Sequence, residues 1–236
     1  MHHVLMDRWS QGTSPLHARD ARAKILALLV FLIVLATTPA NAFAVLVTYS
    51  ALLASGILIA GLPLGGVLVR AMVVLPFSLA FGLISWLSGE PLRALGLVEK
   101  SYLSTVVVLL LAGATPLPLI LSGLERLGTP RLLVLVAQFL YRYLFVLSEQ
   151  AQRMRLAAAC REGGHGRRNL PRFRMATGAL AVLFVRSYER ADGIHRAMLA
   201  RGFLGHFSLL RPLRFRTADG AFLLLVSAFL VLVRVG

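Results

Sequence analysis

Long apolar runs set the first limit on how this chain of 236 residues can fold. Glycine, proline or charged residues separate five of them, which cover residues 25–38, 42–62, 71–88, 102–115 and 221–233. Hydrophobic residues make up 58% of the chain, against about 45–50% in an ordinary soluble domain. A water-soluble fold has no surface on which to place this excess. The runs therefore predict an all-α integral membrane protein with about four to six transmembrane helices.

The first two runs lie close together in the sequence. Residues 25–38 are short for a membrane span, and Pro39 and Asn41 interrupt the chain before residues 42–62. Because proline and asparagine favour turns, we expect two helices in a tight hairpin. A single interrupted membrane entry is the alternative.

Positive charge is concentrated towards the C-terminus. The whole chain carries a net charge of +15, and residues 151–217 hold fourteen arginines against three acidic residues. Cytoplasmic loops of membrane proteins carry an excess of arginine and lysine, so this basic segment is predicted to face the cytoplasm. Residues 1–24 are interpreted as a retained cytoplasmic tail, because no small-residue cleavage site follows the first apolar run.

Residues 132–147 are apolar enough to span a membrane apart from Gln138 and Arg142. A crossing here would place the basic segment outside the cell, against the charge rule. We therefore expect these residues to form a helix that is buried among its neighbours at the cytoplasmic edge of the membrane.

Two long amphipathic helices are predicted in the C-terminal half. The first covers residues 131–161 and stops at Gly163 and Gly164, and the second runs from Arg172 or Met175 to Arg201. Glycine commonly closes a helix, and Gly202 follows the second one. The expected organisation is a tail over 1–24, membrane helices over 25–115, a cytoplasmic helical region over 116–217 and a last membrane helix over 218–236.

The ends of these two helices share a pattern, because each places an arginine in its last turn beside a glycine. A cation in the last turn is favoured by the helix dipole, so the pattern also has a purely structural explanation. On a strongly basic cytoplasmic face, however, paired guanidinium groups also suit carboxylates or carbonyls in a groove of a partner protein. The candidate contact residues are Ala159, Arg161, Gly163, Ala200, Arg201 and Gly202, with Arg153, Arg155, Arg190 and Arg196 as a supporting basic face.

Groups that carry chemistry are sparse in this sequence. The phosphate-binding pattern G-x-x-x-x-G-K-[ST] is absent, the six histidines lack metal-binding spacing, and Cys160 is the single cysteine. We therefore expect no enzyme activity, no cofactor and no metal site of its own. A membrane-embedded enzyme and a basic membrane anchor for anionic lipid or nucleic acid are the alternatives, although nucleic-acid-binding domains do not carry apolar runs of this kind.

Residues 138–155, and residues 186–190 leading into 197–203, resemble the transmembrane T component of energy-coupling factor transporters, in its cobalt-type (CbiQ) branch. The resemblance covers nearly the whole chain from residues 14–17 onward. The second Ala-Arg-Gly motif, Ala200 to Gly202, is intact. The first departs from the family pattern, because Cys160 precedes Arg161 and Glu162 separates it from Gly163.

This resemblance implies a non-catalytic subunit of an importer in the bacterial inner membrane. The two basic helices would be coupling helices whose arginine-bearing ends contact two cytoplasmic ABC-type ATPase subunits. Motion driven by ATP would pass through them to a separate membrane subunit that binds cobalt or nickel, and a small accessory membrane subunit is a further expected partner. ATP and the metal ligands would belong to those partners.

Overall fold

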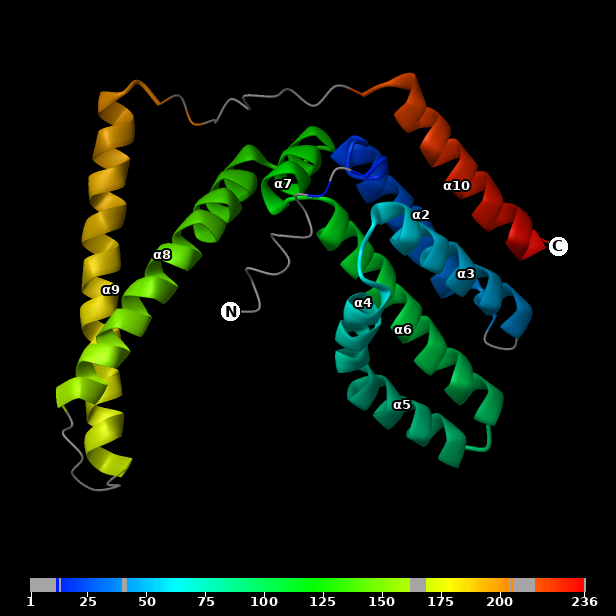
Figure 1. Ribbon diagram of the computed structural model, residues 1–236, viewed down its shortest axis with the longest axis horizontal. Coiled ribbons are helices and arrows are strands. Elements are labelled where there is room, and N and C mark those ends of the chain that lie inside the picture. The colour runs from blue at the N-terminus through cyan, green and yellow to red at the C-terminus, as the bar shows by residue number, and fades with distance from the viewer. Residues whose placement is uncertain are drawn as a thin grey trace. The chain divides into compact units, whose positions relative to one another are not determined.

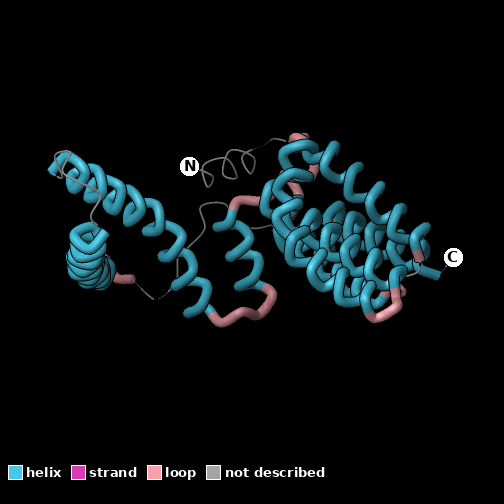
Figure 2. The backbone as a smooth tube through the Cα atoms, turned by 90° about the horizontal axis from the view of Figure 1, so that it is seen from below, coloured by secondary structure: helices cyan, strands magenta, loops and turns pink. Residues whose placement is uncertain are grey.

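Helices form all the regular structure in the part of the chain that the structure describes (Figures 1 and 2). This computed structural model describes residues 12, 14–39, 42–161, 169–203, 205 and 215–235, of which 161, 169–176 and 235 are described by their backbone only. The helices are α2 (Ala21–Thr37), α3 (Phe43–Ala60), α4 (Leu64–Ala71), α5 (Leu75–Leu87), α6 (Pro91–Ala114), α7 (Leu117–Arg126), α8 (Arg131–Arg161), α9 (Asn169–Ala200) and α10 (Thr217–Val235), with a short 3-10 turn (Met72–Val74) between α4 and α5.

The prediction of an all-α membrane protein is confirmed. Five helical segments are long and apolar enough to cross a bilayer, and they cover Phe43–Ala60, Leu64–Leu87, Pro91–Ala114, Arg131–Cys160 and Thr217–Arg234. The first apolar run forms α2, which has 17 residues. Residues 25–38 and 42–62 form two separate helices, as expected, but α2 packs mainly against α6, α7 and α10 and does not form the expected tight hairpin with α3. Helices α2 and α3 meet at an edge-to-face contact between the rings of Phe31 and Tyr49, whose centroids are 5.8 Å apart.

The chain divides into two compact units. Unit 1 comprises Met1–Gly128 and Arg211–Gly236, and unit 2 comprises Thr129–Leu210. The apolar core lies in unit 1, where α6 packs against α2, α3, α4 and α5, and α10 packs against α2 and α3. Gly113 allows one of these close approaches, since a Cβ atom there would lie 3.0 Å from the Leu62 side chain.

Polar side chains hold both ends of α2 in unit 1. At its first turn, the Lys24 ammonium donates hydrogen bonds to the Ala114 carbonyl at 3.1 Å and to Thr115 Oγ1 at 3.0 Å. At its last turn, Arg234 donates to Thr37 Oγ1 at 2.8 Å, and Lys100 donates to the Thr38 carbonyl. Cations suit the exposed carbonyls at a helix C-terminus. These bonds connect α2 to α6 and α10.

Unit 2 consists mainly of the two long helices α8 and α9. The predicted end of α8 at Arg161 is confirmed. Helix α9 begins at Asn169, earlier than the predicted Arg172 or Met175. Pro171, which was expected to belong to the turn before the helix, is helical because the first turn leaves its N–H groups unbonded and so tolerates proline.

The expectation that residues 132–147 are buried among their neighbours is wrong for this chain. Only Val134 is buried in this stretch, and the Leu132 side chain is 72% exposed. The α8 segment also meets the length and composition of a membrane span. The helices of this chain thus leave an apolar face of α8 uncovered.

Candidate functional site

The C-terminal end of α9 carries the intact Ala-Arg-Gly motif and is closed by a paired-hydrogen-bond turn. The Gly202 amide donates to the Leu199 carbonyl at 3.0 Å, and the Phe203 amide donates to the Met198 carbonyl at 3.0 Å. Gly202 has a φ of +73°, the left-handed conformation that this C-terminal motif requires and glycine adopts without strain. The turn therefore ends the helix directly after Arg201.

Arg201 projects from this turn and is exposed, as are Ala200 and Gly202. Its guanidinium has no hydrogen-bond or ion-pair partner among the residues that the structure describes. Five N–H donors in a planar fork are thus available to a carboxylate or to backbone carbonyls of another molecule.

The corresponding end of α8 is only partly described. Arg161 is its last helical residue, and Ala159 in the turn before it is exposed. The side chain of Arg161, and Glu162 and Gly163, lie outside the described residues. The altered first motif stays a prediction.

The two arginine-bearing ends lie at opposite ends of an antiparallel helix pair (Figure 1). The first half of α8, from Val136 to Leu147, faces the second half of α9, from Ser187 to Met198. Helix α9 has 32 residues, so it is about 48 Å long at 1.5 Å per residue. A single small partner cannot reach both ends of such a pair.

The four supporting arginines have different surroundings. Arg153 forms an ion pair with Glu149 at 2.6 Å, and Arg196 forms an ion pair with Asp192. Arg155 is exposed. Arg190 lines a hollow between α8 and α9. These residues therefore do not form one uniform basic face, because two of them are already neutralised by acids one turn earlier in the same helix.

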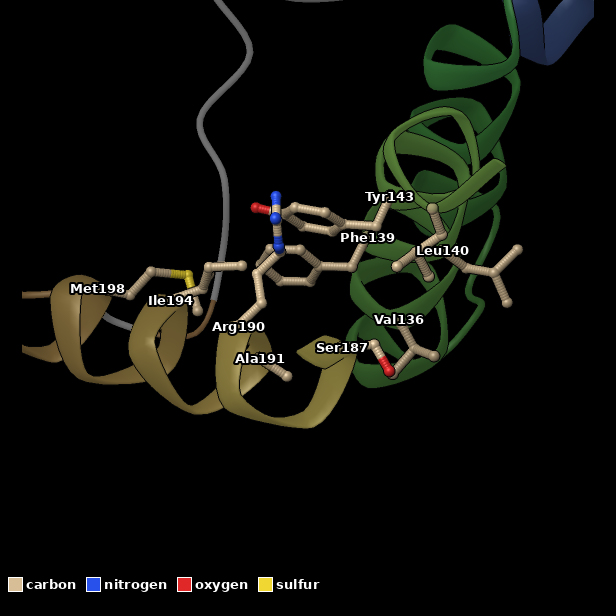
Figure 3. Close-up of a pocket in the computed structure, with 10 residues that line it drawn as sticks. Val136, Phe139, Leu140, Tyr143, Ser187, Arg190, Ala191, Ile194 and Met198 are labelled. Atoms are coloured by element: carbon tan, nitrogen blue, oxygen red, sulfur yellow. The ribbon is translucent and has the colours of Figure 1, made fainter. Parts of the chain in front are cut away.

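The α8–α9 hollow has a volume of about 410 Å³ and was not foreseen from the sequence. Figure 3 shows the side chains of Phe139, Tyr143 and Arg190 projecting into it. The Phe139 and Tyr143 rings are stacked, with their centroids 6.1 Å apart. Five of its residues follow helical spacing on one side of α8, namely Val136, Phe139, Leu140, Tyr143 and Leu147. That periodicity was the available signal, but the sequence does not reveal whether such a face is filled or open.

No group of three or more histidine, cysteine, aspartate or glutamate side chains is arranged to hold a metal ion within the described part of the chain. Two places in unit 2 offer accessible surface for protein partners, namely the Arg201 end and the α8–α9 hollow.

Comparison with known proteins identifies the family. The model of the cobalt transport protein family CbiQ matches residues 12–210. The chain belongs to the CbiQ family. This match includes both long helices of unit 2, so the resemblance seen in their motifs is confirmed.

Two of three similar proteins carry names of transporter components. The chain is 32% identical over 142 residues to the cobalt transport protein CbiQ of Rhodobacter capsulatus, covering 59% of this chain and 57% of that protein. It is 33% identical over 107 residues to an uncharacterized protein of Methanocaldococcus jannaschii, covering 45% of this chain and 39% of that protein. It is 27% identical over 229 residues to the energy-coupling factor transporter transmembrane protein EcfT of Bacillus selenitireducens, covering 86% and 84%.

Proposed function

We propose that this chain is the transmembrane coupling subunit of an energy-coupling factor importer for cobalt or nickel ions. In this role it passes the ATP-driven motion of two ABC-type ATPase subunits to a separate membrane subunit that binds the metal ion. The observation that carries the proposal is Arg201 at the closed end of α9, which is exposed and has no partner among the residues that the structure describes. Membership of the CbiQ family and the name of the Bacillus selenitireducens relative support it.

The geometry of the helix pair supports two separate ATPase contacts in this proposal. Because α8 and α9 end about one helix length apart, Arg161 and Arg201 would each reach a different ATPase subunit. A displacement of one helix end would be carried along the whole rigid helix. The position of Arg161 in the second contact rests on the family pattern, from which this chain departs at Cys160 and Glu162.

The α8–α9 hollow and the exposed apolar residues beside it would receive the metal-binding membrane subunit. Leu132, Leu140 and Phe184 are each more than half exposed, and burial of such residues against a partner is favourable. Metal ligands would then belong to that partner, and nucleotide to the ATPases. This assignment requires the basic segment 151–217 and the N-terminal tail to face the cytoplasm of the bacterial inner membrane.

The decisive experiment reverses the charge at the end of α9. The chain would be co-expressed with its ATPase and metal-binding subunits, and the Arg201→Glu variant compared with Arg93→Glu, which makes the same charge change at the start of α6. We expect Arg201→Glu to lower ATPase co-purification at least about tenfold and to abolish uptake of radioactive cobalt, because it sets like charges against each other at the contact. Membrane insertion should be unchanged in both variants.

Equal effects of the two variants would instead indicate a diffuse field of positive charge, as for a basic membrane anchor. Normal ATPase binding and uptake with Arg201→Glu would refute the proposed coupling role.

A further inference from the structure

Unit 1 contains a cavity of its own, in addition to the α8–α9 hollow of unit 2, and this cavity has no part in the proposed coupling function. It has a volume of about 340 Å³, within the range of small-ligand sites, and its walls come from α2, α3, α6 and α10. The walls are almost wholly apolar, and Phe31, Leu53 and Val107 are among the buried residues that form them.

The cavity lies where α3 and α10 separate. In the first half of α3 and the second half of α10, the two helices are in contact: Tyr49 is fully buried, and its hydroxyl donates a hydrogen bond to the Leu230 carbonyl at 3.3 Å. One to three turns further on, the cavity is lined by Ser55 and Ile59 from α3 and by Phe222 from α10. Ser55 and Ile59 are exposed, so the cavity opens on the outer surface of this helical bundle, at residues of a predicted membrane span.

One end of the cavity is cationic. The charged residues that line it, Arg19 and Lys24, are both positive. The Lys24 ammonium is already bound to three oxygen acceptors, those of His17, Ala114 and Thr115. Arg19 has an ion pair with Asp219 at the long distance of 3.9 Å, and among the described residues its guanidinium donates no hydrogen bond.

Asp219 is more fully engaged than Arg19. Its two oxygens accept hydrogen bonds from the backbone amides of Asp20, at 3.3 Å, and Arg216, at 2.9 Å. The Arg19 side chain remains 34% exposed at the mouth of the cavity. A guanidinium with free donors beside an apolar slot suits a ligand that has an anionic head and a hydrocarbon chain.

The length of the slot agrees with such a ligand. From Lys24 to Phe31 the cavity follows α2 for seven residues, or about 10 Å. One leaflet of the hydrocarbon core is about 15 Å thick, so the slot can take most of one acyl chain. We infer that the cavity between α2, α3, α6 and α10 binds one acyl chain of an anionic phospholipid, whose phosphate lies against Arg19.

The test measures lipid binding to the purified full chain by native mass spectrometry. Dioleoyl-phosphatidylglycerol is titrated against dioleoyl-phosphatidylcholine as the zwitterionic reference. Ala27→Phe fills the slot from the α2 wall and should weaken phosphatidylglycerol binding at least about tenfold, since two or more methylene groups lose their burial. Arg19→Gln should weaken it about fivefold, the usual contribution of one cation to anionic lipid binding.

Two control variants make the result specific. Arg19→Lys keeps the charge and should retain most of the binding. This result would show that Arg19→Gln weakens binding because a charge is lost and not because the protein is misfolded. Arg93→Gln removes a cation that pairs with Glu90 at the far end of α6, and should leave binding unchanged. If Arg93→Gln weakens binding as much as Arg19→Gln, or if Ala27→Phe has no effect, the site does not exist.

A last variant tests whether the N-terminal residues of the chain, and not a lipid, occupy the cavity. If the full chain binds no phosphatidylglycerol at this site but a chain lacking residues 2–11 does, the N-terminus is the occupant and the lipid assignment is wrong. Equal binding by both chains supports the lipid.

Discussion

The two units of this protein differ in how much apolar surface they bury within the chain. Unit 1 buries Leu46, Tyr49 and Leu230 completely and places Lys24 among oxygen acceptors, although the outer faces of its helices are exposed. In unit 2, the α8 side chains of Leu132, Leu140 and Leu156 are each more than half exposed, and Arg201 has no partner among the described residues. Unit 1 thus has a packed core of its own, whereas the surfaces of unit 2 are suited to completion by other proteins. A core and a docking surface can therefore share the same apolar composition.

The largest stability loss should come from removing a core side chain of unit 1. Tyr49→Ala deletes a wholly buried ring that packs against Phe31 and donates to the Leu230 carbonyl. A cavity of this size and a lost hydrogen bond should lower the free energy of unfolding by about 3 kcal/mol or more. Thermal unfolding of the purified chain in detergent would measure this. If Tyr49→Ala lowers the free energy of unfolding by less than about 1 kcal/mol, unit 1 does not have the packed core that distinguishes it from unit 2.

A smaller loss is expected at the polar connection between α2 and α6. Lys24→Met keeps the length of the side chain but removes the donor that serves Ala114 and Thr115. The unsatisfied acceptors should cost about 2 kcal/mol in the same unfolding assay. Lys24→Arg, which keeps the charge, should cost less. If Lys24→Met is neutral, the polar contacts of unit 1 contribute no more to its stability than the exposed ion pairs of unit 2.

The closed end of α9 offers a test within unit 2. Gly202→Ala forces a Cβ atom into a backbone with a φ of +73° and should cost about 1 kcal/mol of helix stability. Gly193→Ala is the matched control, because that glycine lies inside the same helix with open space around it, and alanine there should be stabilising by about 0.5–1 kcal/mol. Circular dichroism during thermal unfolding would compare them. The same sign for both variants would mean that the C-terminal turn is not formed.

The smallest effect on the isolated chain is expected on the exposed face of α8. Leu140 is 65% exposed, so Leu140→Ala should change the free energy of unfolding by less than about 0.5 kcal/mol. The same variant should weaken association with the metal-binding subunit, since a leucine at a protein interface contributes through its burial. A loss of several kcal/mol without any partner would show that this residue is a core residue of the chain.

Much of the fold could be predicted from local patterns. The apolar runs separated by proline and glycine indicated the helices of unit 1, and the glycines after Arg161 and Arg201 indicated where α8 and α9 end. These features depend on neighbours within a few residues, which is why a single sequence reveals them. The start of α9 was predicted too far along the chain, because proline usually interrupts a helix, whereas Pro171 lies in the first turn, where proline is tolerated.

The candidate site could be predicted only in part. The Arg201 end was identified from its spacing and charge, and the structure adds that its guanidinium is exposed and unpaired among the described residues. The α8–α9 hollow and the cavity beside Arg19 were not foreseen, because each is lined by residues that are far apart in the sequence.

The helical membrane character of this chain could be predicted from the sequence, because apolar run length and helix-end residues act locally, and its motifs resembled those of the CbiQ family. Which apolar faces are buried and which stay open depends instead on how the helices pack. Residues 132–147 and the α3 helix have similar apolar character, yet Val134 is the one buried residue of the first, whereas the second contributes Leu46, Tyr49, Leu53 and Ile57 to the core. Burial depends on the helices that pack against a face, and the composition of that face does not specify them.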